Sequence, residues 1–181
     1  MSKIIWLSDT DQNVIYEESS RSFPLETGGV LMGYWARNNI VITNVIGPGP
    51  NAIHLPSSFL PDHDWQLEEI SKIYLFSERI FTYLGDWHSH PTGGLYLSWR
   101  DRRTLNKIAH SPSARAPFPL MLVVSGKDNE WKTGAWLLTG KSLFKWQFGK
   151  VTDVLVHEFP EPVRAPLSNS KDFQAPSHPL R

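Results

Sequence analysis

The sequence predicts an α+β fold, an α/β sandwich in which helices pack against a sheet. Short runs rich in β-branched and aromatic residues recur along the chain, and segments with helical spacing lie between them. The length of 181 residues is enough for one domain with a sizeable core. A hydrophobic fraction of 40% and a mean hydropathy of −0.31 are typical of a globular chain.

The N-terminal part of the chain predicts a strand, a helix and a hairpin. Residues 3–7 form a short apolar run, and residues 12–21 have helical spacing with a thin apolar face. Residues 28–35 and Asn39–Ile46 are rich in valine, isoleucine, leucine and aromatic side chains, with a short turn between them. They therefore predict a hairpin, which the glycine- and proline-rich segment 47–51 ends.

Two further helices and four further strands are expected after the hairpin. Residues 61–77 place apolar side chains at three- and four-residue intervals, and Asp62 stands near the start as a cap. Residues 99–109 predict the second of these helices. The four strands are expected at residues 81–88, 120–124, 131–138 and 151–158.

Residues 1–158 are expected to form one domain, and residues 159–181 a proline-rich C-terminal tail. The body of the chain has no internal repeat, whereas the segment 160–181 holds five prolines and no glycine. Because proline donates no backbone hydrogen bond, this segment predicts an extended conformation rather than a helix or a central strand.

Charge and composition exclude several classes of protein. Eighteen basic and eighteen acidic side chains give a net charge of zero at pH 7, which argues against nucleic-acid binding. No window approaches the roughly 20 apolar residues of a membrane helix, and the first residues do not resemble a secretory signal. We therefore expect a cytoplasmic protein without a membrane partner. The chain has no cysteine, so any metal ligands must offer nitrogen or oxygen.

The most informative segment of the chain predicts a metal site. His88 and His90 are two apart in an expected strand, so both imidazoles point to the same face. Pro91 ends that strand, and the glycine pair at 93–94 lets the chain turn back. Asp101 lies in the first turn of the next helix, where its carboxylate can approach both histidines. Two imidazoles and one carboxylate suit a tetrahedral metal ion that leaves one position for water.

Two more residues are candidates for the chemistry at this site. Ser98 stands three residues before Asp101, which alone indicates a capped helix start, although its hydroxyl can also point at a reacting carbonyl. Glu26 precedes a glycine-rich strand; alone it is an ordinary solvated residue, and beside a metal it becomes the candidate general base. Trp87 and Trp99 flank the predicted ligands and are expected to wall the substrate groove.

Five positions together resemble the JAMM signature of the MPN family: Glu26, His88, His90, Ser98 and Asp101. The signature is a glutamate, a distant His-x-His-Pro, and a serine followed three residues later by an aspartate. The resemblance covers roughly residues 3–155 and implies the family's cytidine-deaminase-like fold, a curved mixed sheet flanked by helices. It also implies a zinc isopeptidase or peptidase in which the two histidines and Asp101 bind Zn²⁺. Glu26 would be its general base, and Ser98 would help to hold the oxyanion.

The residues around these motifs resemble a bacterial branch of the family. This part of the resemblance rests on residues 47–52, 59–62, 65–66, 85–91 and 101–105. In that branch the peptidase is encoded beside enzymes similar to ubiquitin-activating and ubiquitin-conjugating enzymes, notably in CBASS operons with a cGAS/DncV-like nucleotidyltransferase (CD-NTase). The resemblance implies that the protein releases the C-terminal tail of a CD-NTase from its conjugates in antiphage defence. A bacterial ubiquitin-like protein is the alternative substrate.

Two other classes of protein remain open. One is a non-catalytic MPN scaffold that only holds partners, although such modules usually lack the ligands that this chain has. The other is a non-haem iron oxygenase, because two histidines and one carboxylate also suit Fe(II). An oxygenase gives Glu26 no role, and the expected helices do not fit an all-β barrel. The residues therefore favour a zinc peptidase.

Overall fold

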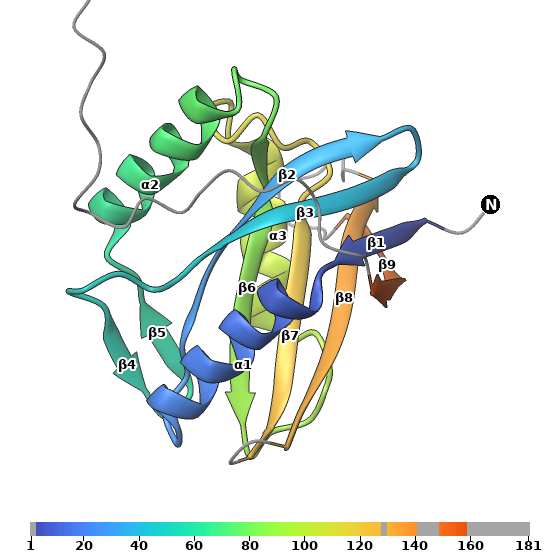
Figure 1. Cartoon of the computed structure of the whole chain (residues 1–181). Coiled ribbons are helices and arrows are strands. Elements are labelled where there is room, and N and C mark those ends of the chain that lie inside the picture. Colours follow the sequence, from blue (N-terminus) through green and yellow to red (C-terminus); the bar gives the residue numbers. More distant parts are fainter. Residues whose placement is uncertain (1–2, 128–129, 141–148, 159–181) are drawn as a thin grey trace, which may run out of the picture.

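The computed structural model describes residues 3–127, 130–140 and 149–158 (Figure 1). In chain order, its elements are β1 (Ile4–Leu7), α1 (Asp9–Ser22), β2 (Gly28–Ala36), β3 (Asn39–Ile46), β4 (Ile53–Leu55), β5 (Ser58–Leu60), α2 (His63–Phe76), β6 (Thr82–Pro91), α3 (Trp99–His110), β7 (Leu120–Lys127), β8 (Glu130–Gly140) and β9 (Lys150–Glu158). Within these described ranges, no helix is long and apolar enough to span a membrane. The tail expected at residues 159–181 lies outside the described residues.

Seven strands form one mixed sheet that closes into a barrel, in the order β1-β3-β2-β6-β7-β8-β9. β1 pairs in parallel with both β3 and β9, and β6 pairs in parallel with β7, while the other neighbours are antiparallel. The mixed sheet with flanking helices agrees with the prediction, but the sheet closes into a barrel and does not form a clear sandwich. The sheet closes because β1 pairs with β9 from Ile4 opposite Leu155 onward, and no local sequence pattern specifies that pairing.

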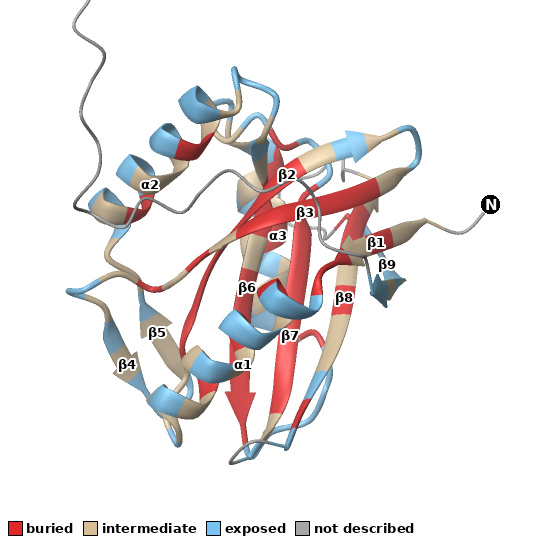
Figure 2. Cartoon of the chain, viewed as in Figure 1, coloured by how far each residue is buried: buried red, intermediate tan, exposed pale blue. Residues whose placement is uncertain are grey.

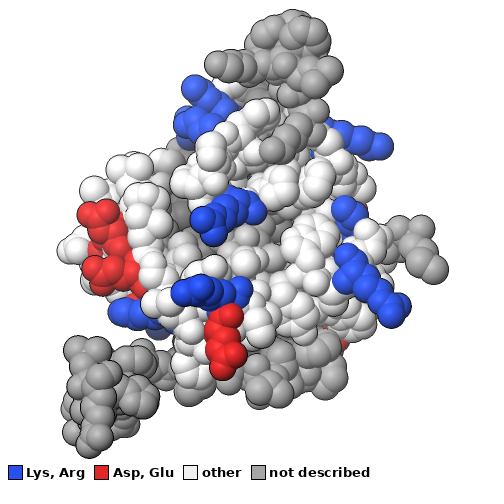
Figure 3. Space-filling model, turned by 90° about the horizontal axis from the view of Figure 1, so that it is seen from above, with Lys and Arg blue, Asp and Glu red and all other residues white. Residues whose placement is uncertain are grey.

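The surface of the described part is more polar than its interior. Figure 2 shows the central strands largely buried, while the helices turn exposed residues outward. On the face seen from above in Figure 3, the lysine and arginine side chains that are drawn are scattered among uncharged residues. A nucleic-acid-binding protein gathers such side chains into a continuous basic stripe, so this face does not favour that class of partner.

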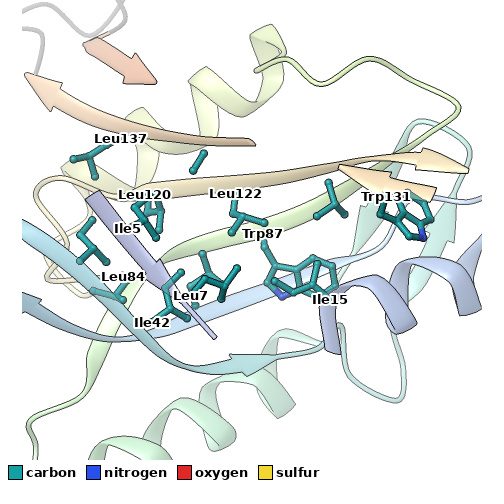
Figure 4. Close-up of a cluster of buried hydrophobic side chains, with 14 residues drawn as sticks. Ile5, Leu7, Ile15, Ile42, Leu84, Trp87, Leu120, Leu122, Trp131 and Leu137 are labelled. Carbon is teal, nitrogen blue, oxygen red and sulfur yellow. The ribbon is translucent and has the colours of Figure 1, made fainter. Parts of the chain in front are cut away.

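The main hydrophobic core fills the inside of the barrel (Figure 4). Its buried members are Ile5, Leu7, Ile15, Leu31, Ile40, Ile42, Leu84, Trp87, Leu120, Leu122, Val124, Trp131, Ala135 and Leu137. Because side chains alternate along a strand, Leu120 and Leu122 point into the barrel while Met121 and Val123 point out of it. Burying a side chain of this size stabilises the fold by about 1.5–3 kcal/mol, so the barrel interior is a major source of stability.

Helices α2 and α3 cover the outer face of the barrel. Ile73 of α2 packs with Val30 and Met32 of β2. Leu105 of α3 packs with Met121 of β7, in a second outer cluster. Strand β6 pairs with both β2 and β7, so its outward-facing side chains lie between these two helix-covered strands. This position makes β6 the strand that can present side chains to both halves of the outer face.

The helices and strands predicted from the sequence are present, with shifted bounds. Helix α1 begins three residues earlier than expected because Ser8 caps it, accepting a hydrogen bond from the Asp11 N–H at 3.1 Å. Asp62 caps α2 as expected. The β4–β5 hairpin is absent from the predicted elements, because strands of three residues are too short to display an alternating pattern.

Candidate metal centre

The last part of β6 presents both histidines to the outer face of the sheet. His88 and His90 are buried and stand on either side of an inward-pointing residue. Trp87 points the opposite way, into the barrel core, where it is 0% exposed (Figure 4). Its indole N–H donates to the Ile46 carbonyl at 3.0 Å. The expectation that Trp87 walls a substrate groove is therefore wrong, because strand alternation places it inside.

A reciprocal pair of hydrogen bonds holds the segment before β2 against β6. The Thr27 N–H donates to the Ser89 hydroxyl at 3.0 Å, and the Ser89 N–H donates to the Thr27 carbonyl at 2.8 Å. The next residue, Gly28, must be small, because a Cβ there would collide with the Phe59 ring. Glu26, the neighbour of Thr27, is thereby fixed beside the strand that carries both histidines.

The start of α3 places the carboxylate. Ser98 is the N-cap, and its hydroxyl accepts a hydrogen bond from the Asp101 N–H at 3.2 Å. In return, the Ser98 N–H donates to Asp101 Oδ2 at 2.7 Å. The capping box expected from the sequence is confirmed, and it fixes the rotamer of Asp101. The second oxygen, Oδ1, then lies 3.3 Å from Nε2 of His88.

These three side chains converge on one point with ligand-like spacing. Their potential ligand atoms all lie within 4.8 Å of one another. His88 Nε2 is 3.0 Å from His90 Nε2, and His90 Nε2 is 3.9 Å from Asp101 Oδ2. Tetrahedral bonds of about 2.0–2.1 Å separate two ligand atoms by about 3.3–3.4 Å. The distances from His88 Nε2 to His90 Nε2 and to Asp101 Oδ1 lie near that value, whereas the 3.9 Å distance ends on the other carboxylate oxygen. The three residues therefore suit one tetrahedral metal ion with a fourth position left for water.

The loop after β6 orients the second imidazole. Nδ1 of His90 lies 3.3 Å from the Gly94 carbonyl, which can only accept, so Nδ1 carries the hydrogen. Nε2 therefore keeps its lone pair toward the other two side chains. The Ser125 hydroxyl of β7 donates to the Gly93 carbonyl at 2.6 Å and holds this loop in place. The glycine pair expected to form a turn thus also supports a ligand.

The surroundings of His90 and Asp101 favour the protonation states in which these two side chains bind metal. Burial alone would raise the pKa of Asp101, but hydrogen bonds from His88 and Ser98 hold the pKa of that carboxyl well below its usual range. Burial lowers the pKa of His90, and the neighbouring His88 lowers it further. A carboxylate and a neutral imidazole are the forms in which these side chains ligate a metal ion.

Glu26 lies beside the three converging side chains rather than among them. Burial raises the pKa of its half-buried carboxyl, His88 lowers it in part, and Asp101 raises it again. Because the charges of both His88 and Asp101 shift this pKa, the carboxyl of Glu26 lies close to the point where they converge. A raised pKa also brings a carboxyl nearer to the range in which it can take up and release a proton at neutral pH.

The β4–β5 hairpin, which the sequence patterns miss, is hydrogen-bonded to Glu26 and to the start of α3. Its turn is tied to α3, since Nη1 of Arg100 donates to the Ser57 carbonyl at 3.1 Å. Large apolar side chains are exposed on the hairpin and at the start of α3: Ile53, Leu55, Leu60 and Trp99. Trp99 is 60% exposed, and its place in the wall of a substrate groove stays a prediction. The signal that could have revealed the hairpin is the Pro56-Ser57 turn between two apolar triplets.

A closed mixed sheet that presents two imidazoles and one carboxylate to a single point defines a class of protein with a mononuclear metal centre. The model of the family of prokaryotic homologues of the JAB domain matches residues 10–139, and the chain belongs to this family. The resemblance to JAMM/MPN proteins in the sequence is thereby confirmed.

Two curated relatives and one solved structure agree with this assignment. "Probable metalloprotease y4qB" of Sinorhizobium fredii is 43% identical over 147 residues, which cover 79% of this chain and 90% of that protein. The "CD-NTase/cGAS isopeptidase" of Escherichia coli is 23% identical over 141 residues, or 71% of this chain and 86% of that protein. A solution structure of a Desulfitobacterium hafniense protein has the same fold, with a TM-score of 0.62 and 19% identity; the match covers 87% of this chain and 95% of the other.

Proposed function

We propose that this protein is a zinc-dependent isopeptidase or peptidase that hydrolyses the bond after the C-terminus of a conjugated protein. One observation carries the proposal: three potential ligand atoms lie within 4.8 Å of one another, with a carboxyl of raised pKa beside them. When bound, zinc would supply a Lewis acid that polarises the scissile carbonyl and lowers the pKa of a water molecule. His88, His90 and Asp101 would hold the ion, in agreement with a donor set of nitrogen and oxygen only.

Glu26 and Ser98 would then move the proton and stabilise the developing charge. Glu26 accepts a proton from the attacking water and delivers it to the leaving amine as the C–N bond breaks. The new carboxylic acid then loses the second proton of the water to the amine, so the products are a carboxylate and an ammonium group, and the carboxyl of Glu26 ends the cycle ionised as it began. The Ser98 hydroxyl donates a hydrogen bond to the carbonyl oxygen while negative charge develops there.

The surface around the centre suits an extended peptide. The exposed apolar side chains of the β4–β5 hairpin and Trp99 of α3 offer contact area to a chain that lies between them. The hairpin is a two-stranded sheet of its own, so a substrate tail can add to it as a further strand. An extended tail exposes its scissile bond, whereas a folded segment does not.

We propose the C-terminal tail of a CD-NTase as the substrate, with a role in antiphage defence. The Escherichia coli relative supports this choice, because its name describes a CD-NTase isopeptidase. The resemblance of residues 85–91 and 101–105 to the CBASS-associated branch supports it as well. A bacterial ubiquitin-like protein is the substrate to compare directly in the same assay.

The test uses the zinc-loaded protein and a CD-NTase fused through its C-terminus to a reporter, with mass spectrometry of the products. We expect one cut directly after the CD-NTase tail, which a chelator abolishes and added zinc restores. Glu26→Gln should keep its zinc and lose cleavage by about 10²–10⁴-fold, because it removes the proton acceptor. Zinc binding without cleavage of any tail fusion would indicate a scaffold. Full cleavage by Glu26→Gln would contradict the role of Glu26.

A further inference from the structure

The backbone of Glu26 is held by a different element from the one that follows it in the chain. Glu26 lies two residues before β2, outside the strands of the barrel. Its N–H donates to the Leu55 carbonyl at 2.9 Å. Its carbonyl lies 3.0 Å from Nδ1 of His54. Both polar groups of the Glu26 backbone are therefore bound by two consecutive residues of β4.

The contact from His54 is a side-chain hydrogen bond with a fixed direction. The Glu26 carbonyl can only accept, so Nδ1 of the half-buried imidazole is the donor. The Leu55 carbonyl belongs to the backbone of the same strand, so the two bonds act on both sides of one α-carbon. Because they set the orientation of the Glu26 backbone, they also set the direction in which its carboxyl leaves the chain.

The hairpin that carries His54 is itself attached to both sides of the metal centre. His54 pairs with Phe59 of β5, and the Phe59 ring packs over Gly28 at the start of β2. On the other side, Arg100 of α3 donates to the hairpin turn. The hairpin thus bridges the segment that carries Glu26 and the helix that carries Asp101, and His54 is its side-chain contact to Glu26.

We propose that His54 is a positioning residue for the general base. Its imidazole N–H holds the Glu26 carbonyl, so that the carboxyl of Glu26 faces the point where His88, His90 and Asp101 converge. His54 touches neither that point nor a reacting atom and acts only through Glu26. The inference rests on the proposed function, because that function gives Glu26 the proton transfer.

The kinetic test compares three variants of the zinc-loaded protein on the CD-NTase reporter fusion. His54→Ala should lower kcat by about 10- to 100-fold with KM within about twofold, since a misplaced base slows the step without weakening binding. His54→Asn places an amide N–H close to the position of Nδ1 and should recover kcat to within about threefold of the wild type. The control is His110→Ala, which removes the same kind of bond, from Nδ1 to the Asn106 carbonyl at 2.8 Å, at the far end of α3. It should leave kcat unchanged.

A second measurement does not depend on activity. Amide hydrogen exchange at Glu26 reports the bond to Leu55, and it should become faster in His54→Ala but stay slow in His54→Asn and His110→Ala. Zinc content should equal that of the wild type in all three variants, because none of them is a proposed ligand. If His54→Ala does not fold, kcat and Glu26 amide exchange in His54→Asn, compared with the wild type, still test the positioning role.

The outcomes separate this inference from the proposed function. Wild-type kcat and a slowly exchanging Glu26 amide in His54→Ala overturn the inference and leave the peptidase intact. A His54→Asn variant that folds, keeps the Glu26 amide protected and still loses kcat also overturns it. Absence of cleavage by the zinc-loaded wild type instead refutes the proposed function, and full cleavage by Glu26→Gln refutes the role of Glu26. In both cases the exchange data stand as a result on the His54 bond alone.

Discussion

Ser98→Ala separates the structural role of Ser98 from its proposed catalytic role, because the chain contains a matched control. Ser98 and Asp101 form a cap at the start of α3, and Ser8 and Asp11 form a similar one at the start of α1. In both, the serine hydroxyl accepts from the aspartate N–H, at 3.2 and 3.1 Å. Only the first of the two caps lies at the metal centre. Ser8→Ala therefore removes a cap and nothing else that the reaction uses.

Losing the helix cap and losing the oxyanion donor should have measurable effects of different kinds and sizes. Loss of an N-cap costs about 1 kcal/mol of folding stability. A domain with about 5–15 kcal/mol of stability stays more than about 99% folded after such a loss, so the cap alone cannot change kcat measurably. Loss of a donor to a developing oxyanion costs about 10²–10³-fold in kcat. We therefore expect similar destabilisation of both variants and a fall in kcat of that size for Ser98→Ala alone.

The assay combines urea denaturation, zinc content by elemental analysis, and kcat on the CD-NTase reporter fusion. Ser98 also hydrogen-bonds the Asp101 carboxylate, so its removal could act through the ligand instead. Zinc content tells these apart: the oxyanion role requires full zinc occupancy together with the loss of kcat. A Ser98→Ala variant with wild-type kcat, or one whose loss of activity follows its loss of zinc, refutes the oxyanion role.

Two further predictions concern pH and stability. The carboxyl of Glu26 must be ionised to accept a proton, and its pKa is raised by burial, lowered by His88 and Arg100 and raised by Asp101. Consequently, in the metal-free protein, the carboxyl of Glu26 should become protonated at a higher pH than an exposed glutamate as the pH drops; carboxyl NMR checks this, and a midpoint at or below 4.5 contradicts this environment. Trp87→Phe should lower the free energy of unfolding by about 1–3 kcal/mol, because it leaves the buried Ile46 carbonyl without its donor. Urea denaturation checks this, and unchanged stability would show that another donor replaces the indole.

The residues whose positions follow from local spacing could be predicted from the sequence. His88 and His90 share a face because strand residues alternate, and Asp101 approaches them because Ser98 starts a helix three residues earlier. Each of these relations spans a few residues and depends on backbone geometry alone. The hairpin of β2 and β3 follows from the same kind of local signal.

The features that the sequence does not reveal all depend on contacts between distant segments. Barrel closure requires β9 to return to β1, and the two strands lie near opposite ends of the described chain. Strand alternation turns Trp87 away from both histidines, but only the closed barrel shows that the opposite face is the buried interior. His54 reads as an ordinary histidine in the sequence, and its contact to Glu26 spans 28 positions.

The residues proposed to bind the metal lie close together in the sequence, whereas the proposed general base is distant from them. All three proposed ligands and Ser98 lie within the fourteen residues from His88 to Asp101, on β6, one loop and the first turn of α3. Glu26 comes from the segment before β2, the strand that pairs with β6, and its backbone is held by β4. The proposed metal binding and the proposed proton transfer therefore depend on different parts of the fold. A perturbation of the β4–β5 hairpin should lower kcat at full zinc occupancy, whereas a perturbation of the loop after β6 should remove the zinc and the activity together.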